Sequence, residues 1–302
     1  MHVPETIPTL ATAAGLCPAF EVLEPSVQSL PLVFCSPHSG RVYPSAFLES
    51  SRLSDAAIRR SEDLFVDQLF DFVPALGAPL QIARFPRAFL DVNREPYELD
   101  PRMFDGPLPA FANTASVRVA GGLGTIPRIV AEREDIYRDK LTVSEGLARI
   151  EAIYTPFHAT LSELLRRTRE RFGIAVLIDC HSMPSTVRAL PGGRRPDMVI
   201  GDRFGTSASS RIVTLAQSGL SALGYDVMRN KPYAGGFITE RYGKPNGGIH
   251  ALQIEINRGL YADEARFLPS FGFDSLRLDL MDFVTRFVAD LDADLGYAAA
   301  AE

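Results

Sequence analysis

The chain has 302 residues, and its 46% hydrophobic and 23% charged fractions are typical of a globular protein with a substantial core. A net charge of -6 argues against a nucleic-acid binder, which would need a basic face to neutralise phosphates. No stretch approaches the roughly 18 apolar residues of a membrane-spanning helix, so we expect no membrane partner. The three scattered cysteines form no disulfide framework and the N-terminus has no signal-peptide pattern, so we expect a cytoplasmic protein. The oligomeric state is left open.

The first third of the chain alternates strand-like and helix-like segments. Residues 1–25 are expected to form an irregular arm, and the apolar run 30–36 predicts a buried strand. Ser54 is a plausible N-cap for a long helix that Gly77 ends, because apolar residues recur between them at helical spacing. Strand-like runs follow at 80–85 and 88–92.

Residues 101–127 are rich in glycine and proline, and a loop of that length is a candidate active-site loop or lid. Beyond it the sequence predicts helix over 144–172 with an interruption near Pro156, strands at 174–179, 198–200 and 251–256, and helices at 206–223 and 274–295. This alternation predicts one three-layer α/β domain over residues 1–302, with a mixed central sheet and helices on both faces.

Two of the five histidines, His38 and His181, come just after apolar strand-like runs. Ligands of open α/β sheets bind beyond the carboxyl ends of the strands. Imidazole is a common zinc ligand, and a catalytic zinc typically takes three protein ligands and leaves one position open. The two histidines therefore suggest a metal site, while the alternative is that each one satisfies a loop carbonyl.

Carboxylates that could complete such a site lie in two places. Glu62 and Asp63 fall midway along the helix that starts near Ser54, and they are either a solvated charged pair or the source of a third ligand. Glu255 stands between two isoleucines, and alternation places it on one strand face with Gln253 and Asn257. Burial of a carboxylate is costly unless it is paired or catalytic. Glu255 is thus a candidate general base, with a structural salt bridge as the alternative.

Four arginines are candidates for binding an anionic substrate. Arg94, with Asn93, follows a short strand, where a guanidinium is well shaped for bidentate capture of a carboxylate, and Arg87 lies nearby. Paired glycines at 235–236 and 247–248 bracket a segment that contains Arg241 and Tyr242. That segment is either a mobile or closely approached loop before the Glu255 strand, or a surface hairpin. Arg203 is the fourth candidate.

These separate signals combine into a family pattern. The segments that carry it are PHSG (37–40), EDLFVDQLFDF (62–72), DVNR (91–94), DCHSMPS (179–185), RPDMVIGDRFGTS (195–207) and GGFITERYGKPNGGIHALQIEINRGLY (235–261). In this order, and over most of residues 30–265, the chain resembles the N-formylglutamate amidohydrolases.

The resemblance implies a zinc-dependent amidohydrolase, with another divalent metal as an option, and a fold similar to that of the zinc carboxypeptidases. It implies cleavage of N-formyl-L-glutamate to formate and L-glutamate, a step of histidine degradation. Carried over by motif, the metal ligands are His38, Asp63 and His181, the general base is Glu255, a second catalytic residue that also binds a substrate carboxylate is Arg94, and the other substrate contacts are Asn93, Arg87, Arg203, Arg241 and Tyr242.

The chain departs from the family pattern in two places. Glu62-Asp63-Leu64 replaces a Thr-Asp-Trp run, and residues 230–234 differ from an Asn-Gly-Arg-Phe-Lys segment. Hydrolysis of N-formylaspartate or of a γ-linked glutamyl compound is therefore the alternative within the enzyme class. From another class, the alternative is a catalytically inactive small-acid binding protein on the same fold.

Overall fold

The computed structural model describes residues 16–295 except 131–133, 188, 190–192 and 194. The described residues group into two compact units. Unit 1 takes residues 16–21, 40–62 and 83–160, and unit 2 takes 22–39, 63–82 and 161–295. Both units are discontinuous in sequence, and the single domain expected from the sequence stays a prediction. Among the residues described, no helix has the length and apolar character needed to cross a membrane.

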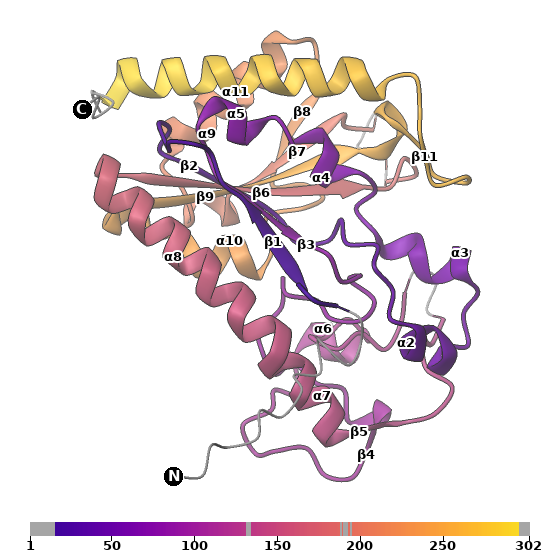
Figure 1. Ribbon diagram of the computed structural model, residues 1–302. Coiled ribbons are helices and arrows are strands. Elements are labelled where there is room, and N and C mark those ends of the chain that lie inside the picture. The colour runs from indigo at the N-terminus through magenta and orange to yellow at the C-terminus, as the bar shows by residue number, and fades with distance from the viewer. Residues whose placement is uncertain (1–15, 131–133, 188, 190–192, 194, 296–302) are drawn as a thin grey trace. The chain divides into compact units, whose positions relative to one another are not determined.

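A seven-stranded mixed sheet organises unit 2 (Figure 1). Its strand order is β1-β3-β2-β6-β9-β7-β8. Strands β3, β2, β6 and β9 run parallel, whereas β7 is antiparallel to β9 and parallel to β8. The bounds are Phe20–Leu23 for β1, Leu32–Ser36 for β2, Leu80–Ala83 for β3, Ala175–Met183 for β6, Met198–Gly201 for β7, Val227–Arg229 for β8 and Ile249–Asn257 for β9.

The two faces of this sheet differ in chemistry because successive side chains of a strand point to opposite sides. One face is apolar: Phe34, Ile178 and Leu252 are register partners across β2, β6 and β9. It packs against α4 (Val66–Leu69), α5 (Val73–Leu76), α9 (Ser210–Ala222) and α11 (Phe273–Leu295). Burial of these aliphatic and aromatic side chains is the main favourable term for this unit.

The opposite face carries polar side chains toward the carboxyl ends of β6 and β9, among them Asp179, His181, Gln253 and Glu255. Helix α10 (Phe237–Tyr242) packs on β6 and β9 there, and the part of α8 (Thr155–Phe172) that belongs to unit 2 lies on the same side (Figure 1). Helices thus cover both faces of a mixed sheet, which confirms the predicted three-layer α/β class.

The elements that the structure describes in unit 1 are short, apart from the first part of α8. They are α2 (Ser45–Ser50), α3 (Asp55–Ile58), β4 (Phe104–Asp105), α6 (Val117–Ala120), β5 (Leu141–Thr142) and α7 (Val143–Arg149), followed by a π-helical turn at Ile150–Tyr154. That turn is the interruption expected near Pro156. A buried cation supports the unit: the Arg149 guanidinium lies 4.0 Å from the centroid of the Phe89 ring and 2.6 Å from Glu145 Oε1.

The long helix predicted between Ser54 and Gly77 is wrong in its middle. Ser54 does cap α3, accepting a hydrogen bond from Ala57 N, and Gly77 ends α5 in the left-handed region at φ 100°. Between these ends Glu62 is extended and Phe65 has φ 57°. The Asp63 amide donates to the His38 carbonyl at 3.0 Å, so a tertiary hydrogen bond replaces the helical one. The helical period of the apolar residues did not reveal this break.

Three other expectations need correction. Residues 88–92 form turns rather than a strand. The arm expected over residues 1–25 includes strand β1, and residues 1–15 lie outside the described part. His181 lies inside β6, which extends to Met183, because β6 pairs with β9 beyond the end of its apolar run. Residues 101–127 include β4, α6 and a 3₁₀ turn at Pro101–Met103, and their role as a lid stays a prediction.

Candidate metal centre

Three neighbouring parallel strands deliver the central groups of the site, all within unit 2. His38 follows β2 by two residues, and His181 stands near the carboxyl end of β6. Glu255 on β9 is the register partner of His181, so the two side chains project from the same face of the sheet. The structure thus brings His38, His181 and Glu255 to the carboxyl ends of these strands, where the ligands of open α/β sheets bind.

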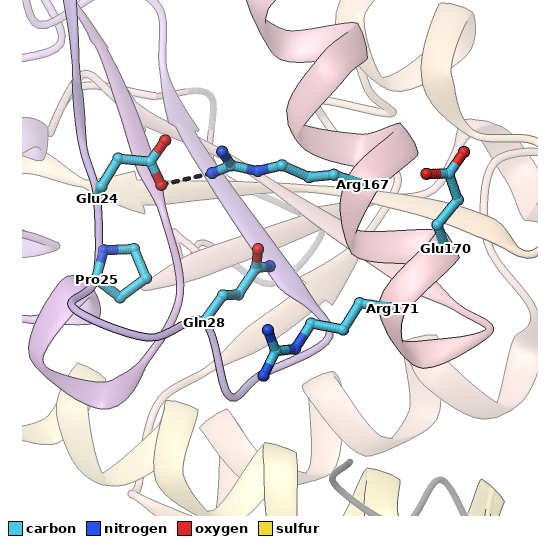
Figure 2. A pocket seen from close by; sticks show the side chains of 6 residues that line it. All are labelled: Glu24, Pro25, Gln28, Arg167, Glu170 and Arg171. Carbon is cyan, nitrogen blue, oxygen red and sulfur yellow. Dashed lines mark hydrogen bonds and ion pairs between the residues drawn. The ribbon is translucent and has the colours of Figure 1, made fainter. Parts of the chain in front are cut away.

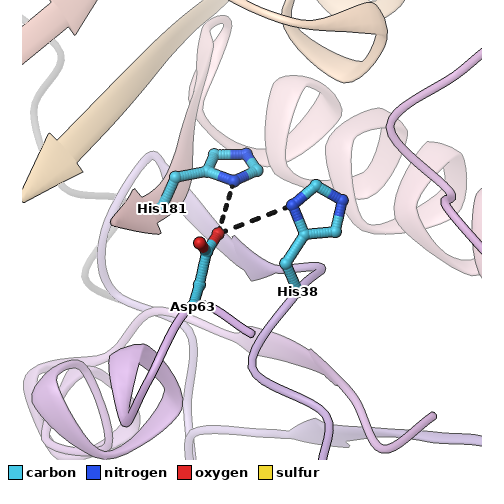
Figure 3. Close-up of side chains that lie close together, drawn as sticks. All are labelled: His38, Asp63 and His181. Carbon is cyan, nitrogen blue, oxygen red and sulfur yellow. Dashed lines mark hydrogen bonds and ion pairs between the residues drawn. The ribbon is translucent and has the colours of Figure 1, made fainter. Parts of the chain in front are cut away.

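His38, Asp63 and His181 are buried and each offers a ligand atom within 4.8 Å of the others. Asp63 Oδ2 lies 3.0 Å from His181 Nδ1 and 3.5 Å from His38 Nδ1 (Figure 3). Donors bound tetrahedrally about 2 Å from a zinc ion are roughly 3.3 Å apart. The two distances bracket that separation, and two imidazoles with one carboxylate form a donor set that zinc accepts. These residues therefore fit a divalent metal.

A second carboxylate fixes the orientation of the His181 ring. Asp179, fully buried on the same strand, places Oδ1 3.0 Å from His181 Nε2, and the Thr239 hydroxyl on α10 donates to Asp179 Oδ2 at 3.3 Å. Burial disfavours the imidazolium, but the charge of Asp179 and the hydrogen bonds to Asp179 and Asp63 raise the pKa of His181 well above its usual range. An outer carboxylate of this kind typically orients a metal-bound histidine.

The Asp63 carboxylate is held from both sides. The Ser182 hydroxyl donates to Oδ1 at 3.2 Å, while Oδ2 faces the two histidines. Burial works against ionisation, yet the hydrogen bonds with His181 and His38 outweigh it and hold the pKa of Asp63 well below its usual range. Asp63 is therefore ionised and available as an anionic ligand throughout the neutral range.

These pKa directions predict that metal binding releases a proton near neutral pH. Without a metal, His181 carries its second proton there, and a metal ligand must be the neutral imidazole. Affinity for a divalent metal should rise with pH up to the raised pKa of His181, by about tenfold per unit. Titration calorimetry at pH 7 in buffers of different ionisation enthalpy measures the proton count, and an enthalpy independent of the buffer would contradict this prediction.

Glu255 is not one of the three clustered ligand candidates, and the side-chain amide of Gln253 holds its carboxylate in place. The Gln253 side chain donates Nε2 to Glu255 Oε1 at 2.7 Å, and its own Oε1 accepts from the Gly236 amide at 2.7 Å. The backbone at the start of α10 therefore sets which end of the Gln253 amide faces the carboxylate. Glu255 is 6% exposed, so it keeps a fixed position on the strand next to His181.

The structure distinguishes between Glu62 and Asp63 as candidates for the third metal ligand. Glu62 accepts from Arg59 Nε at 2.9 Å and Nη2 at 3.2 Å, and the Tyr43 hydroxyl donates to it at 2.7 Å. This half-buried bidentate pair occupies both oxygens of Glu62, whereas Asp63 lies against the two histidines. The geometry favours Asp63, the residue that the family motif had selected.

The predicted arginine site of unit 1 is built on Asp91. Its Oδ2 lies 3.0 Å from Arg87 Nε and 3.3 Å from Arg94 Nη2, and its Oδ1 accepts the Asn93 amide at 2.8 Å. Arg94 also donates to the carbonyls of Leu123 and Asn93, both at 2.7 Å. Burial, countered by the charge of Asp91, lowers the pKa of Arg94 to about 10. The structure thus brings Arg87, Asn93 and Arg94 together in one cluster.

The remaining predicted contacts lie in unit 2 on or beside α10. The segment between the paired glycines forms this helix, so neither a loop nor a surface hairpin is found there. The close approach expected at the glycines is present at Gly235, where a Cβ would lie 3.1 Å from the Thr239 side chain. Arg241 is exposed, and Tyr242 is buried, which raises its pKa to about 12. Arg203 pairs with Glu240 Oε2 at 2.6 Å and donates to the Gly235 carbonyl at 3.3 Å. Arg203 is therefore already engaged at the start of this helix.

The sequence interpretation missed three polar groups around the cluster: Asp179, Ser182 and Thr239. Asp179 carried a detectable signal, since alternation places it on the same face as His181, in a strand too apolar for an unpartnered carboxylate. Thr239 gave no comparable signal, because its role depends on how α10 packs.

A hollow of about 580 Å³ lies apart from this cluster, where the turn after β1 faces the end of α8 (Figure 2). It is open to solvent and is lined by Glu24, Pro25, Gln28, Arg167, Glu170 and Arg171. Arg167 already pairs with Glu24 at 2.5 Å, and the two acidic and two basic side chains balance in charge. None of its lining residues is a histidine or a cysteine, whereas the His38–Asp63–His181 cluster gathers three possible metal ligands and is therefore the candidate site.

The fold and the cluster define a mixed-sheet α/β protein with a candidate metal centre at the carboxyl ends of its central parallel strands. The profile of the family described as N-formylglutamate amidohydrolase matches residues 30–262. The chain therefore belongs to the N-formylglutamate amidohydrolase family, as its motifs had indicated.

Individual relatives agree with this assignment. An N-formylglutamate deformylase of Pseudomonas aeruginosa is 31% identical over 81% of this chain and 86% of its own length. A deformylase of the same name from Pseudomonas putida is 33% identical over 78% of this chain and 83% of its own length. The crystal structure of N-formylglutamate amidohydrolase from Ralstonia eutropha superposes with a TM-score of 0.83, at 34% identity, and covers 92% of this chain and 99% of that one.

A further solved structure, of a gene product from Agrobacterium tumefaciens, has a TM-score of 0.65 at 21% identity. The match covers 91% of this chain and 96% of that one, and it supports the fold alone.

Proposed function

We propose that this chain is a metal-dependent amidohydrolase that cleaves N-formyl-L-glutamate to formate and L-glutamate. Membership of the family and the names of the relatives support the reaction. The observation that carries the proposal is the buried cluster of His38, Asp63 and His181, with Glu255 on the adjacent strand in register with His181. From the sequence we carry over a cytoplasmic location and a role in histidine degradation as parts of the same proposal.

Zinc is the metal that we propose first, because its tetrahedral preference suits two imidazoles and one carboxylate. His38, Asp63 and His181 would hold it, with Asp179 behind His181. A divalent metal bound there would acidify water and polarise the formyl carbonyl.

The residues of the chain itself would carry the proton and the substrate. Glu255 accepts the proton of the attacking water and passes it to the leaving amine, as a general base and then a general acid. Arg94, with Asn93 and Arg87, binds a substrate carboxylate and stabilises charge on the carbonyl oxygen. We propose Arg203, Arg241 and Tyr242 as further substrate contacts. A dianionic substrate requires at least two cationic partners, and these arginines supply them.

The substrate claim is tested by formate release from N-formylglutamate, N-formylaspartate and N-formylglutamine with zinc-loaded protein. We expect kcat/KM to be highest for N-formylglutamate. Its side-chain carboxylate can form an ion pair with a guanidinium, whereas the neutral amide of N-formylglutamine cannot. Arg94→Gln should raise KM for the dianion. Faster turnover of N-formylaspartate would favour the alternative substrate, and no release from any of the three would refute the claim.

The alternative from a different class is a catalytically inactive protein that binds a small acid on the same fold. The presence of His38, Asp63, His181 and Glu255 together argues against it, since a chain that lost catalysis would not be expected to keep every one. Binding of N-formylglutamate without formate release by metal-loaded protein would favour that alternative.

A further inference from the structure

Arg258 is a buried cation next to the candidate metal centre that the proposed reaction does not use. It begins a 3₁₀ turn, Arg258–Leu260, directly after β9, and only 7% of it is exposed. The Asn257 side chain caps this turn by accepting the Gly259 amide at 2.9 Å. The turn therefore fixes the backbone of Arg258 directly after β9, the strand that carries Glu255.

The guanidinium reaches Asp63 by two routes. Arg258 Nε donates to the Ser182 hydroxyl at 3.0 Å, and that hydroxyl donates to Asp63 Oδ1 at 3.2 Å. Arg258 Nη2 also lies 3.7 Å from the same oxygen. Serine and guanidinium thus act on Oδ1, while Oδ2 faces His38 and His181.

The same segment also holds the backbone beside Asp63. The Tyr261 hydroxyl donates to the Leu64 carbonyl at 2.7 Å. Residues 62–65 form no continuous helix, so their position depends on such tertiary bonds. On the far side of the guanidinium, Glu264 Oε1 lies 3.5 Å from Arg258 Nη1 and steadies it.

We propose that Arg258 is a positioning residue that, with Ser182, holds Asp63 so that Oδ2 alone faces the two histidines as a metal ligand. The inference rests on the proposed function, because it assigns a role toward the metal of that site. Arg258 does not touch the reacting atoms: it restricts rotation of a carboxylate that has two equivalent oxygens. Without it, Oδ1 would keep only the Ser182 hydroxyl, which would lose the guanidinium that donates to it. The carboxylate could then turn, which would weaken the metal site.

The test compares metal affinity, by chelator competition with Zn²⁺, in the wild type and in Arg258→Gln, Arg258→Lys and Ser182→Ala. Loss of an outer hydrogen-bond partner typically weakens metal binding by about 10–100-fold, and we expect that loss in Arg258→Gln. Arg258→Lys should recover part of it, because the charge remains. Arg266→Gln is the matched control from the same segment, since Arg266 is 78% exposed and 3.8 Å from Asp263. Its affinity should equal that of the wild type.

The absorption spectrum of Co²⁺-loaded protein gives a second readout, because its d–d bands shift when a ligand changes position. Ser182→Ala removes a smaller group than Arg258→Gln does. It tests the hydrogen-bonded path from Arg258 through Ser182 to Asp63 even if Arg258→Gln fails to fold. Wild-type affinity and an unchanged cobalt spectrum in Ser182→Ala and in folded Arg258→Gln would overturn the inference. A wild type that binds neither ion would instead refute the proposed function, and the inference with it.

Discussion

His181→Ala removes the proposed metal site and with it the activity. His181 is the centre of the cluster: one ring nitrogen faces Asp63 Oδ2 and the other faces Asp179 Oδ1, each at 3.0 Å. The substitution deletes a ligand and leaves the buried Asp179 carboxylate without its imidazole. We expect metal affinity to fall by more than the roughly 100-fold upper range for loss of an outer partner.

Metal content after dialysis and formate release by the metal-saturated variant measure this effect. His250→Ala is a suitable control, because His250 lies on β9 and is not part of the cluster. Its imidazole accepts the Ser209 amide at 3.2 Å, so a moderate loss of stability is expected there without loss of metal. Retention of one firmly bound metal per chain in His181→Ala would contradict the assignment of this ligand.

Glu255→Gln should separate metal binding from catalysis. The substitution keeps the size of the side chain and removes its ability to accept a proton, while Glu255 is not one of the three clustered ligand candidates. Loss of a general acid–base group typically costs about 10²–10⁴-fold in rate, so we expect kcat to fall within that range and KM to change little.

Because the Gln253 side chain donates to Glu255 Oε1, the new amide can still accept that hydrogen bond through its oxygen. The fold and the metal content should therefore stay close to those of the wild type, as checked by thermal unfolding and metal analysis. Near wild-type turnover in Glu255→Gln would show that another group takes the proton.

Much of the fold was predictable because the strands of unit 2 are nearly continuous apolar runs, as parallel buried strands usually are. The run at 174–179 predicted β6, and the residues around Glu255 predicted β9. These strand positions were enough to place His38 and His181 at the same end of the sheet, since parallel strands carry their carboxyl ends to the same side. Glu255 joined them only through the family motif.

The part that could not be predicted lies where tertiary bonds outweigh local patterns. The apolar spacing after Ser54 favours one helix, yet the bond from the Asp63 amide to the His38 carbonyl breaks it. Residues 88–92 have strand-like composition but form turns. The Asp91 carboxylate in this segment pairs with Arg87 and Arg94 and accepts the Asn93 amide. No local signal in the sequence specifies such contacts.

The family motifs selected Asp63 over Glu62 where the residues alone left the choice open. In the structure Glu62 pairs with Arg59, and Asp63 lies with the two histidines. Arg258 illustrates the opposite case, because a cation directly after the Glu255 strand looks like an ordinary surface residue until the fold places it against Ser182. Orientation of the ligands is thus the property that required three-dimensional information.

The most direct test of the central claim is metal content measured together with activity through a cycle of chelation and reloading. Elemental analysis of the wild-type protein should give one divalent metal per chain. Formate release from N-formylglutamate should disappear as a chelator removes the metal, and should return in proportion to the zinc restored. Full turnover by protein that contains no divalent metal would contradict the account.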